Sequence, residues 1–236
     1  MQLWVTRPAD DGADLAQALE ARGHNVIVEP LLKIEPCSDA SPHLDGASAI
    51  VATSKNALRV LAKTPAFTSA VDQRLVVVGP GTADEAQRLG FHHVQVGPGR
   101  AADLPELIHS LPGIGDAPVA VLRGEDVAYD LEGVLRSLGL DVRRHILYRA
   151  VPTASPSPAL VRQIADGKVD GVLLFSQRTA EQYVCRLTEA RIESAARRLR
   201  HYCLSAAVAA PLRQSGFADA LVSAKPNVKE MVELIG

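Results

Sequence analysis

The stretch VAVLRGEDVAYDLEGVLRSLGLDVRRHILYRAVP, residues 119–152, decides how this chain folds. Its first residues are apolar and predict a buried strand, and a polar turn follows at 123–126. Leucine and valine then recur at helical spacing over 131–138, and Gly139 is suited to end that helix. Residues 141–151 stay extended, and at roughly 3.3 Å per residue such a run spans well over ~30 Å. A strand of that length predicts that the chain leaves one domain and enters another.

A second long extended run, NVIVEPLLKIEPC, lies at residues 25–37. Pro30 and Pro36 restrict it to edge or bulge positions of a sheet. Two such runs are awkward inside one compact domain, but two crossings between domains would use both. We therefore predict a discontinuous first domain with the second domain inserted in it, each of a usual size. The predicted segments are residues 1–33 plus 152–236 for the first domain, 38–146 for the second, and about 30–37 and 144–152 for the crossing strands.

Composition limits the classes of function. The chain has 236 residues, of which 47% are hydrophobic, enough for two modest cores. A formal net charge of -2 gives no case for nucleic-acid binding. No apolar run approaches the ~20 residues that span a bilayer, and no targeting pattern is visible, so we expect a cytoplasmic protein without membrane contact.

Cysteine and histidine spacing predicts no metal site. Cys37, Cys185 and Cys203 show no CxxC pattern, which favours reduced structural thiols over a disulfide or a metal site. The seven histidines show no ligand spacing such as HExxH.

The same pattern recurs along the whole chain: an apolar strand, one or two hydroxyl residues, a helix and a glycine. Strands that alternate with helices predict parallel sheets covered on both faces. With five strands expected in each domain, we predict an α/β fold of two flavodoxin-like, doubly wound parallel-sheet domains joined by a two-stranded β linker.

Ligands of open α/β sheets bind beyond the carboxyl ends of the strands, and the recurring hydroxyls fall there. Serine and threonine are also preferred helix caps, so each alone has a structural interpretation. Their repetition in both domains favours a cleft for an anionic ligand, because helix amino termini suit negative charge. The loop Gly79-Pro80-Gly81-Thr82 lacks the nucleotide-binding patterns, so no cofactor is predicted. Tyr148, on a crossing strand, is either a packing residue or a functional phenol.

Nine segments, in order along essentially the full length, carry a resemblance to a known family. They are VTRP (5–8), EPLLKIEP (29–36), IVATSKNAL (50–58), VVVGPGTADEAQRLG (76–90), VLRGE (121–125), LYRAVP (147–152), LLFSQRTAEQYV (173–184), CLSAAVAAPLRQSG (203–216) and KPNVKEMVELI (225–235). Each motif alone is weak, but their order and spacing are specific. Together they make the chain similar to uroporphyrinogen-III synthase.

The resemblance implies a cofactor-free lyase that cyclises the linear tetrapyrrole hydroxymethylbilane. The terminal hydroxyl leaves as water, and the resulting azafulvene closes through a spiro intermediate that inverts the terminal ring. Tyr148 matches the family's linker tyrosine and is the expected acid, since a phenol is protonated at neutral pH. Arg7, Lys55 and Arg123 are suited to pair with carboxylates. The residues that line up with substrate-facing turns are Thr6, Arg7, Thr53, Ser54, Lys55, Thr82, Arg123, Gly124, Ser176, Gln177 and Ser205.

The chain departs from the family pattern in two turns. Ser205-Ala206-Ala207 stands where many relatives have a Gly-Pro-Thr-like turn, and Ser176-Gln177 stands where they have Ser-Pro. The first departure weakens the case for a threonine contact on that side. The alternative to the enzyme is a non-enzymatic hinge protein whose two domains bind a small anionic ligand. For the enzyme we expect a monomer that acts on a small molecule.

Overall fold

The computed structural model describes residues 1–38, 40–154 and 156–236. The chain divides into two compact units: unit 1 is Met1–Lys33 with Val151–Gly236, and unit 2 is Ile34–Ala150. Asp39, in the predicted second domain, and Ser155, in the predicted first domain, lie outside the described residues. Unit 1 is therefore built from the two ends of the chain and unit 2 from its middle.

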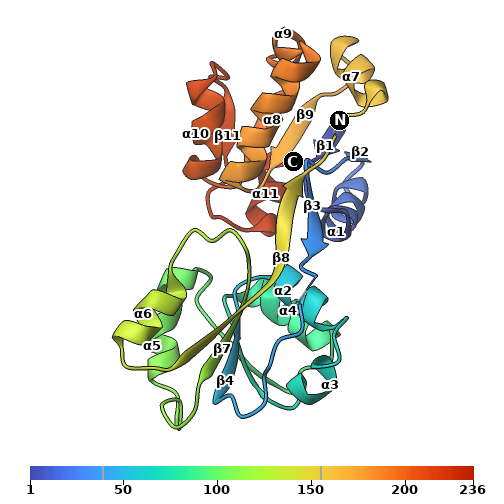
Figure 1. Cartoon of the computed structure of the whole chain (residues 1–236). Helices are drawn as coiled ribbons and strands as arrows, with labels where there is room; N and C mark the ends of the chain where they lie inside the picture. Colours follow the sequence, from blue (N-terminus) through green and yellow to red (C-terminus); the bar gives the residue numbers. More distant parts are fainter. Residues whose placement is uncertain (39, 155) are drawn as a thin grey trace. The chain divides into compact units, whose positions relative to one another are not determined.

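A parallel five-stranded sheet in the order β11-β10-β9-β1-β2 forms the centre of unit 1 (Figure 1). Its strands are β1 (Gln2–Val5), β2 (Asn25–Val28), β9 (Gly171–Leu174), β10 (Arg200–Cys203) and β11 (Ala220–Val222). Its helices are α1 (Ala9–Glu20), α7 (Pro158–Ala165), α8 (Gln177–Ala190), α9 (Glu193–Ala196), α10 (Ala206–Gln214) and α11 (Val228–Ile235). Leu3 and Val5 join the core under α1 and α11, whereas Trp4 joins the core under α8 on the other face. This alternation explains why both faces of the sheet need helices.

Unit 2 has a six-stranded sheet in the order β3-β8-β7-β4-β5-β6 (Figure 1). Its strands are β3 (Leu32–Pro36), β4 (Ala49–Ala52), β5 (Arg74–Val77), β6 (His93–Val96), β7 (Val119–Gly124) and β8 (Val142–Pro152). Its helices are α2 (Lys55–Leu61), α3 (Phe67–Ala70), α4 (Pro80–Arg88), the 3₁₀ turn η1 (Ala101–Asp103), α5 (Leu104–His109) and α6 (Leu131–Ser137). Ile50 packs in the core with α2 and α4, and Val51 packs in the core with α5 and α6.

The predicted α/β class with parallel sheets is confirmed, and the strand count differs in unit 2. Five strands were expected there, but β3 pairs with β8 and makes six. The extended run 25–37 is two strands in two sheets, β2 and β3, with Pro30 between them. Proline has no N–H for a ladder and fixes its own φ, which explains the break at this position.

The two segments of unit 1 are tied together where unit 2 departs from it. The Thr153 backbone N–H donates to the Leu31 carbonyl at 3.1 Å. The Thr153 hydroxyl donates to the Pro30 carbonyl at 2.6 Å. Leu31 is fully buried in the core of unit 1. These contacts close unit 1 across the position at which the chain leaves and returns.

Candidate functional site

The strand order of each sheet reverses at one point, and the predicted site residues surround those two points. In unit 1 the chain builds β1 and β2, then continues from β9 on the other side of β1. In unit 2 it builds β4, β5 and β6, then continues from β7 on the other side of β4. Crevices at such switch points, beyond the carboxyl ends of the strands, are the usual ligand sites of open α/β sheets. We call these two edges the unit 1 rim and the unit 2 rim.

Tyr148 lies at the unit 2 rim beside the end of β7. It is the register partner of Gly124 in the β7–β8 pair, just after an irregularity between Arg123 and Gly124. Its hydroxyl lies 2.8 Å from the Ser54 Oγ. Burial raises the pKa of the phenol, and its interactions with the Ser54 and Asn56 side chains oppose that rise. The phenol is therefore fully protonated at neutral pH, as an acid must be.

Ser54 and Gly124 determine where the ring of Tyr148 can lie. Ser54 is the N-cap of α2, and its Oγ accepts from the Ala57 N–H at 3.2 Å. A Cβ added to Gly124 would lie 2.8 Å from the Tyr148 Cε2 and Cζ atoms. Real Cβ atoms do not approach ring carbons so closely, so a larger residue at 124 would displace the phenol.

Lys55 brings a positive charge to the same rim. A Cβ added to Gly81 would lie 3.3 Å from the Lys55 Cε and 3.9 Å from its Nζ, so this side chain crosses the first turn of α4. The ammonium therefore stands beside the amino terminus of a nine-residue helix. Both features favour an anionic group. Thr53, which precedes Ser54, is half-buried at the end of β4.

The Arg123 guanidinium is bonded to groups of its own unit, in the loop after β7 and in α6. Its Nε donates to the Glu132 Oε1 at 2.6 Å, and its Nη1 donates to the carbonyls of Gly124 at 2.9 Å and Glu125 at 2.8 Å. Only 8% of Arg123 is exposed, and Glu132 balances its charge. Arg123 therefore shapes the turn after β7 in this structure, and its pairing with a ligand carboxylate stays a prediction. Glu132 was not found from the sequence, because its position in α6 looks like an ordinary first-turn acid.

The two predicted threonines Thr6 and Thr82 are also buried. Thr6 is fully buried, and its hydroxyl donates to the Leu173 carbonyl at 2.6 Å, which ties β1 to β9. Thr82 is 6% exposed, within α4. Both residues are part of the packed structure, and their contacts with a substrate stay predictions.

The remaining predicted residues of unit 1 lie at its rim. The Arg7 guanidinium donates to Asp11 at 2.6 Å and lies 4.7 Å from the centre of the Phe175 ring. Ser176 caps α8 by accepting from the Thr179 N–H at 3.1 Å, and Gln177 is exposed beside it. Ser205 begins α10 with a half-buried hydroxyl that makes no cap bond within the described segments.

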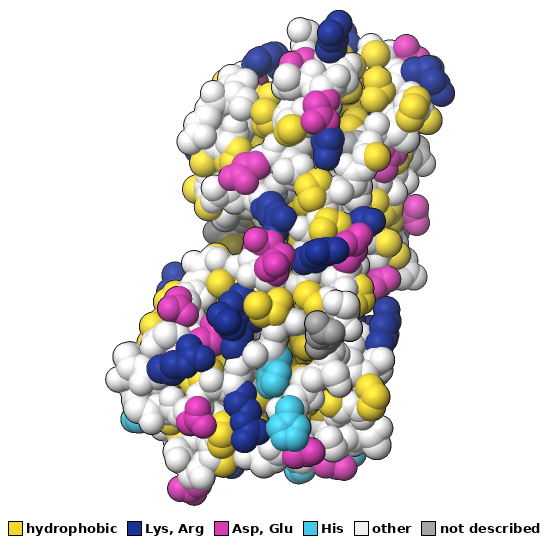
Figure 2. Space-filling view, viewed as in Figure 1, with side chains coloured by type: hydrophobic (Ala, Val, Ile, Leu, Met, Phe, Trp, Pro, Cys, Tyr) yellow, Lys and Arg dark blue, Asp and Glu magenta, His cyan; other side chains and the backbone are white. Residues whose placement is uncertain are grey.

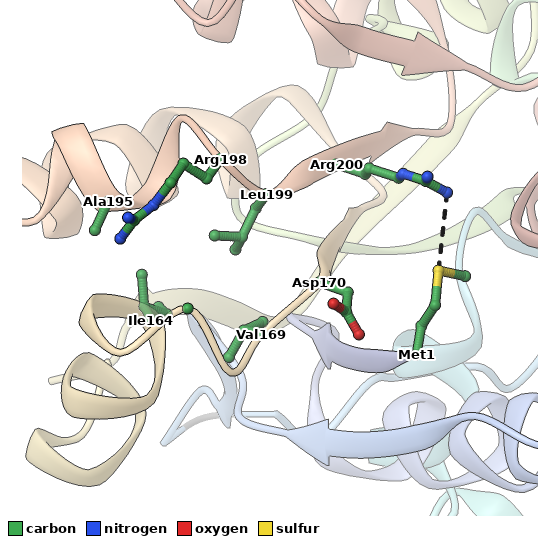
Figure 3. Close-up of a pocket in the computed structure, with 9 residues that line it drawn as sticks. Met1, Ile164, Val169, Asp170, Ala195, Arg198, Leu199 and Arg200 are labelled. Carbon is green, nitrogen blue, oxygen red and sulfur yellow. Dashed lines mark hydrogen bonds between the residues drawn. The ribbon is translucent and has the colours of Figure 1, made fainter.

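A depression in unit 1 of about 350 Å³ lies at the opposite, amino-terminal ends of its strands (Figure 3). Arg198 donates to the carbonyl of Ala165, at the end of α7. Arg200 extends over Met1 on the other side of the depression (Figure 3). The Asp170 carboxylate accepts from the Gln2 N–H. These charges do not converge on one point, so the depression is no second candidate for an anion site.

The described residues offer little for metal or thiol chemistry. Among residues 1–38, 40–154 and 156–236, no group of three or more His, Cys, Asp or Glu side chains is placed to hold a metal ion. The three cysteines are free thiols. Burial raises the pKa of Cys203 to about 12, which keeps that thiol protonated.

On the face shown in Figure 2, acidic and basic side chains are interspersed. Within the described part of the chain, no helix is both long and apolar enough to cross a membrane.

Comparison with known proteins gives a family and a fold. The family model for uroporphyrinogen-III synthase (HemD) matches residues 13–233. The structure of uroporphyrinogen-III synthetase from Helicobacter pylori aligns with a TM-score of 0.65 at 16% identity, over 99% of this chain and 97% of that one. A mutant uroporphyrinogen III synthase from the extremely thermophilic bacterium Thermus thermophilus aligns with a TM-score of 0.58 at 17% identity, over 99% and 96%. No curated protein sequence gives a significant match.

Proposed function

The chain belongs to the uroporphyrinogen-III synthase family, and we propose that it performs the family's reaction with the Tyr148 phenol as the acid. The family consists of cyclising hydro-lyases of tetrapyrrole biosynthesis that need no cofactor. Hydroxymethylbilane loses water and closes with its terminal ring inverted. The observation that carries the proposed role is the Tyr148 hydroxyl, protonated and hydrogen-bonded to Ser54 at 2.8 Å, at the carboxyl edge of the unit 2 sheet.

The reaction needs one proton donor beside the leaving hydroxyl of the substrate. As the C–O bond of the terminal hydroxymethyl group breaks, its electron pair goes to oxygen and the phenol donates its proton, so that water leaves. The substituted carbon of the last pyrrole attacks the azafulvene, and the spiro intermediate fragments and closes again. The proton that the ring loses on final closure returns to the phenolate. Acid assistance of this kind contributes typically about 10²- to 10⁴-fold.

Positioning accounts for the choice of isomer, because unassisted closure gives the uninverted ring. Lys55, beside the first turn of α4, is the proposed contact for a substrate carboxylate at the unit 2 rim. Thr53 is the neighbouring hydroxyl there. At the unit 1 rim the proposed contacts are Arg7, Ser176, Gln177 and Ser205.

The strand orders support the finer proposal that each unit is a doubly wound, flavodoxin-like domain, with β3 and β8 as connecting strands. We also propose that the working form is a monomer. The formal net charge of -2 and the free thiols support the proposal of a cytoplasmic enzyme without a nucleic-acid partner.

The direct test supplies hydroxymethylbilane to the protein and separates the oxidised product isomers by chromatography. We expect the inverted isomer from the wild type. Tyr148→Phe keeps the ring but removes the proton, and we expect kcat/KM to fall by about 10²-fold or somewhat less. The product should stay inverted, because the contacts that hold the substrate are unchanged.

Rates need correction for spontaneous closure, and thermal melts must show that the variant is folded. A Tyr148→Phe enzyme within about two-fold of wild type would reduce Tyr148 to a packing residue. A wild-type protein that binds the substrate but yields only the uninverted isomer would support the non-enzymatic alternative.

A further inference from the structure

The phenol of Tyr148 is held by groups that also determine where its proton points. The Ser54 Oγ lies 2.8 Å from its hydroxyl, and interaction with the Asn56 side chain lowers the pKa of the phenol. Each of the two hydroxyls in the Ser54–Tyr148 pair has one proton, so one of them donates and the other accepts. If Tyr148 donated to Ser54, its proton would point into the protein and away from a ligand. The direction of this one bond therefore decides whether the phenol can act as an acid.

The surroundings of Ser54 favour donation from Ser54 to Tyr148. The Ser54 Oγ already accepts from the Ala57 N–H at 3.2 Å as the cap of α2. A serine hydroxyl that accepts on one side still has its own proton to donate on the other. The Asn56 amide also supplies N–H donors. With Ser54 donating, the phenol oxygen accepts and its own O–H is free to point outward.

We infer that Ser54 is a positioning residue, which donates to the Tyr148 oxygen and so presents the phenol proton to the leaving hydroxyl. This inference rests on the proposed function of Tyr148. Gly124 has a complementary role, because only a residue without a side chain leaves room for the ring at 2.8 Å. Ser54, expected from the sequence to bind substrate, instead acts through Tyr148.

The same bond serves the step that follows proton transfer. When the phenol has given its proton to the leaving hydroxyl, it carries a negative charge in a partly buried position. Hydrogen bonds from Ser54 and Asn56 stabilise that phenolate until the proton from ring closure returns to it. Hydrogen bonds to charged acceptors are stronger than those to neutral ones, so the interaction grows as the charge forms.

The test is the titration of residue 148 itself. Placing 3-fluorotyrosine at 148 lowers the phenol pKa into an accessible range, and ¹⁹F NMR follows its ionisation without substrate. If Ser54 donates, Ser54→Ala should raise the pKa of residue 148 by roughly one unit, because the phenolate loses a donor. Ser54→Thr keeps the hydroxyl and should restore the value. If Tyr148 donates instead, losing its acceptor should lower the pKa, which would overturn the inference, as would an unchanged pKa.

Controls separate this effect from the loss of a helix cap. Asn227 caps α11 by accepting from the Glu230 N–H at 2.9 Å, so Asn227→Ala removes a cap of similar strength elsewhere. It should leave the titration of residue 148 unchanged. If Ser54→Ala does not fold, Ser54→Gly removes the donor with only a small capping penalty.

Kinetics then distinguish this inference from the proposed function. In unlabelled enzyme, Ser54→Ala should lower kcat by about tenfold with little change in KM. A raised KM at constant kcat would indicate that Ser54 binds substrate, and would overturn its positioning role. If Tyr148→Phe is silent, the proposed acid fails and the catalytic part of this inference fails with it. A pKa rise in Ser54→Ala would then still show that Ser54 donates.

Discussion

Arg123 and Glu132 are two side chains joined by a hydrogen bond inside unit 2. We expect the loss of either one to lower the stability of the protein. Removing Arg123 leaves Glu132, 3% exposed, without its charge partner. Breaking a buried ion pair on one side costs about 3 to 5 kcal/mol. We predict that Arg123→Ala lowers the free energy of unfolding by an amount of that order in urea denaturation. The double variant Arg123→Met, Glu132→Leu should recover much of the loss, because no charge remains buried.

The same experiment tests the original interpretation of Arg123 as a substrate contact. A stable Arg123→Ala protein whose KM alone is raised would support that interpretation. The sequence suggested an arginine at a substrate-facing turn. It did not indicate that Glu132, nine residues later, would meet it, because helical periodicity gives no information on which side chains pair across a loop.

His201 should make unit 1 sensitive to acid. Burial lowers its pKa to about 4, and the charge of Asp219 and a backbone bond at Leu199 oppose that shift. The Tyr183 hydroxyl lies 2.9 Å from its Nε2 in the core. In the unfolded chain the imidazole pKa is about 6.5, so between these two values the unfolded state binds more protons. We predict that stability falls as the pH drops from about 7 to about 4, by up to about 3 kcal/mol.

His201→Gln is the matched variant, because an amide can still accept from Tyr183 but does not titrate in this range. Urea denaturation followed by the fluorescence of Trp4 at several pH values measures the effect, since Trp4 is the single tryptophan and lies in the same core. An equal pH dependence in His201→Gln and wild type would show that other groups cause it.

At the scale of elements, α2 and α4 are joined by a charged pair. Glu85 of α4, 5% exposed, accepts from the Arg59 Nη2 of α2 at 3.0 Å, and Arg88 also contacts it. Burial raises the pKa of Glu85, but the bonds from Arg59 and Arg88 outweigh it, so the net shift is downward and the carboxylate stays charged. This ion pair holds α2, which Ser54 caps, against α4, whose first turn the Lys55 side chain crosses.

We predict that Glu85→Ala lowers the stability of unit 2 by a few kcal/mol, since it removes the buried carboxylate that accepts from Arg59. Arg88→Ala is the control: its side chain is 65% exposed, and surface pairs contribute about 0 to 1 kcal/mol. Far-UV circular dichroism in urea measures both variants. Equal losses from the two changes would contradict the importance of the Arg59 bond.

The sequence predicted the strands and helices better than it predicted which side chains contact one another. Residues 142–152 form one strand, as the extended run at 141–151 predicted, because no glycine or turn residue interrupts it. The hydroxyls after β4 and β9 became caps, Ser54 and Ser176, as their types predicted. Whether a hydroxyl faces a ligand or a neighbouring strand depends on tertiary packing. That is why Thr6 and Thr82 are buried, although the pattern placed them beside Ser54 and Ser176.

At the scale of the whole molecule, each hydrophobic cluster in the described residues lies within one unit. Two clusters belong to unit 1 and two to unit 2. We therefore predict that the units unfold separately. Trp4 fluorescence reports unit 1, whereas circular dichroism reports both, so their urea transitions should not coincide. Glu85→Ala should shift the dichroism curve and leave the Trp4 curve unchanged. Superimposable transitions in wild type would show a single cooperative molecule.

The bonds between Thr153 and residues 30–31 have a consequence for the engineering of the chain. They hold together the two backbone ends between which the middle of the sequence is inserted. Because these bonds already hold the two ends of unit 1 together, only a short loop is needed in place of unit 2. Replacing residues 34–150 with a few glycines should therefore leave unit 1 as a domain that folds on its own.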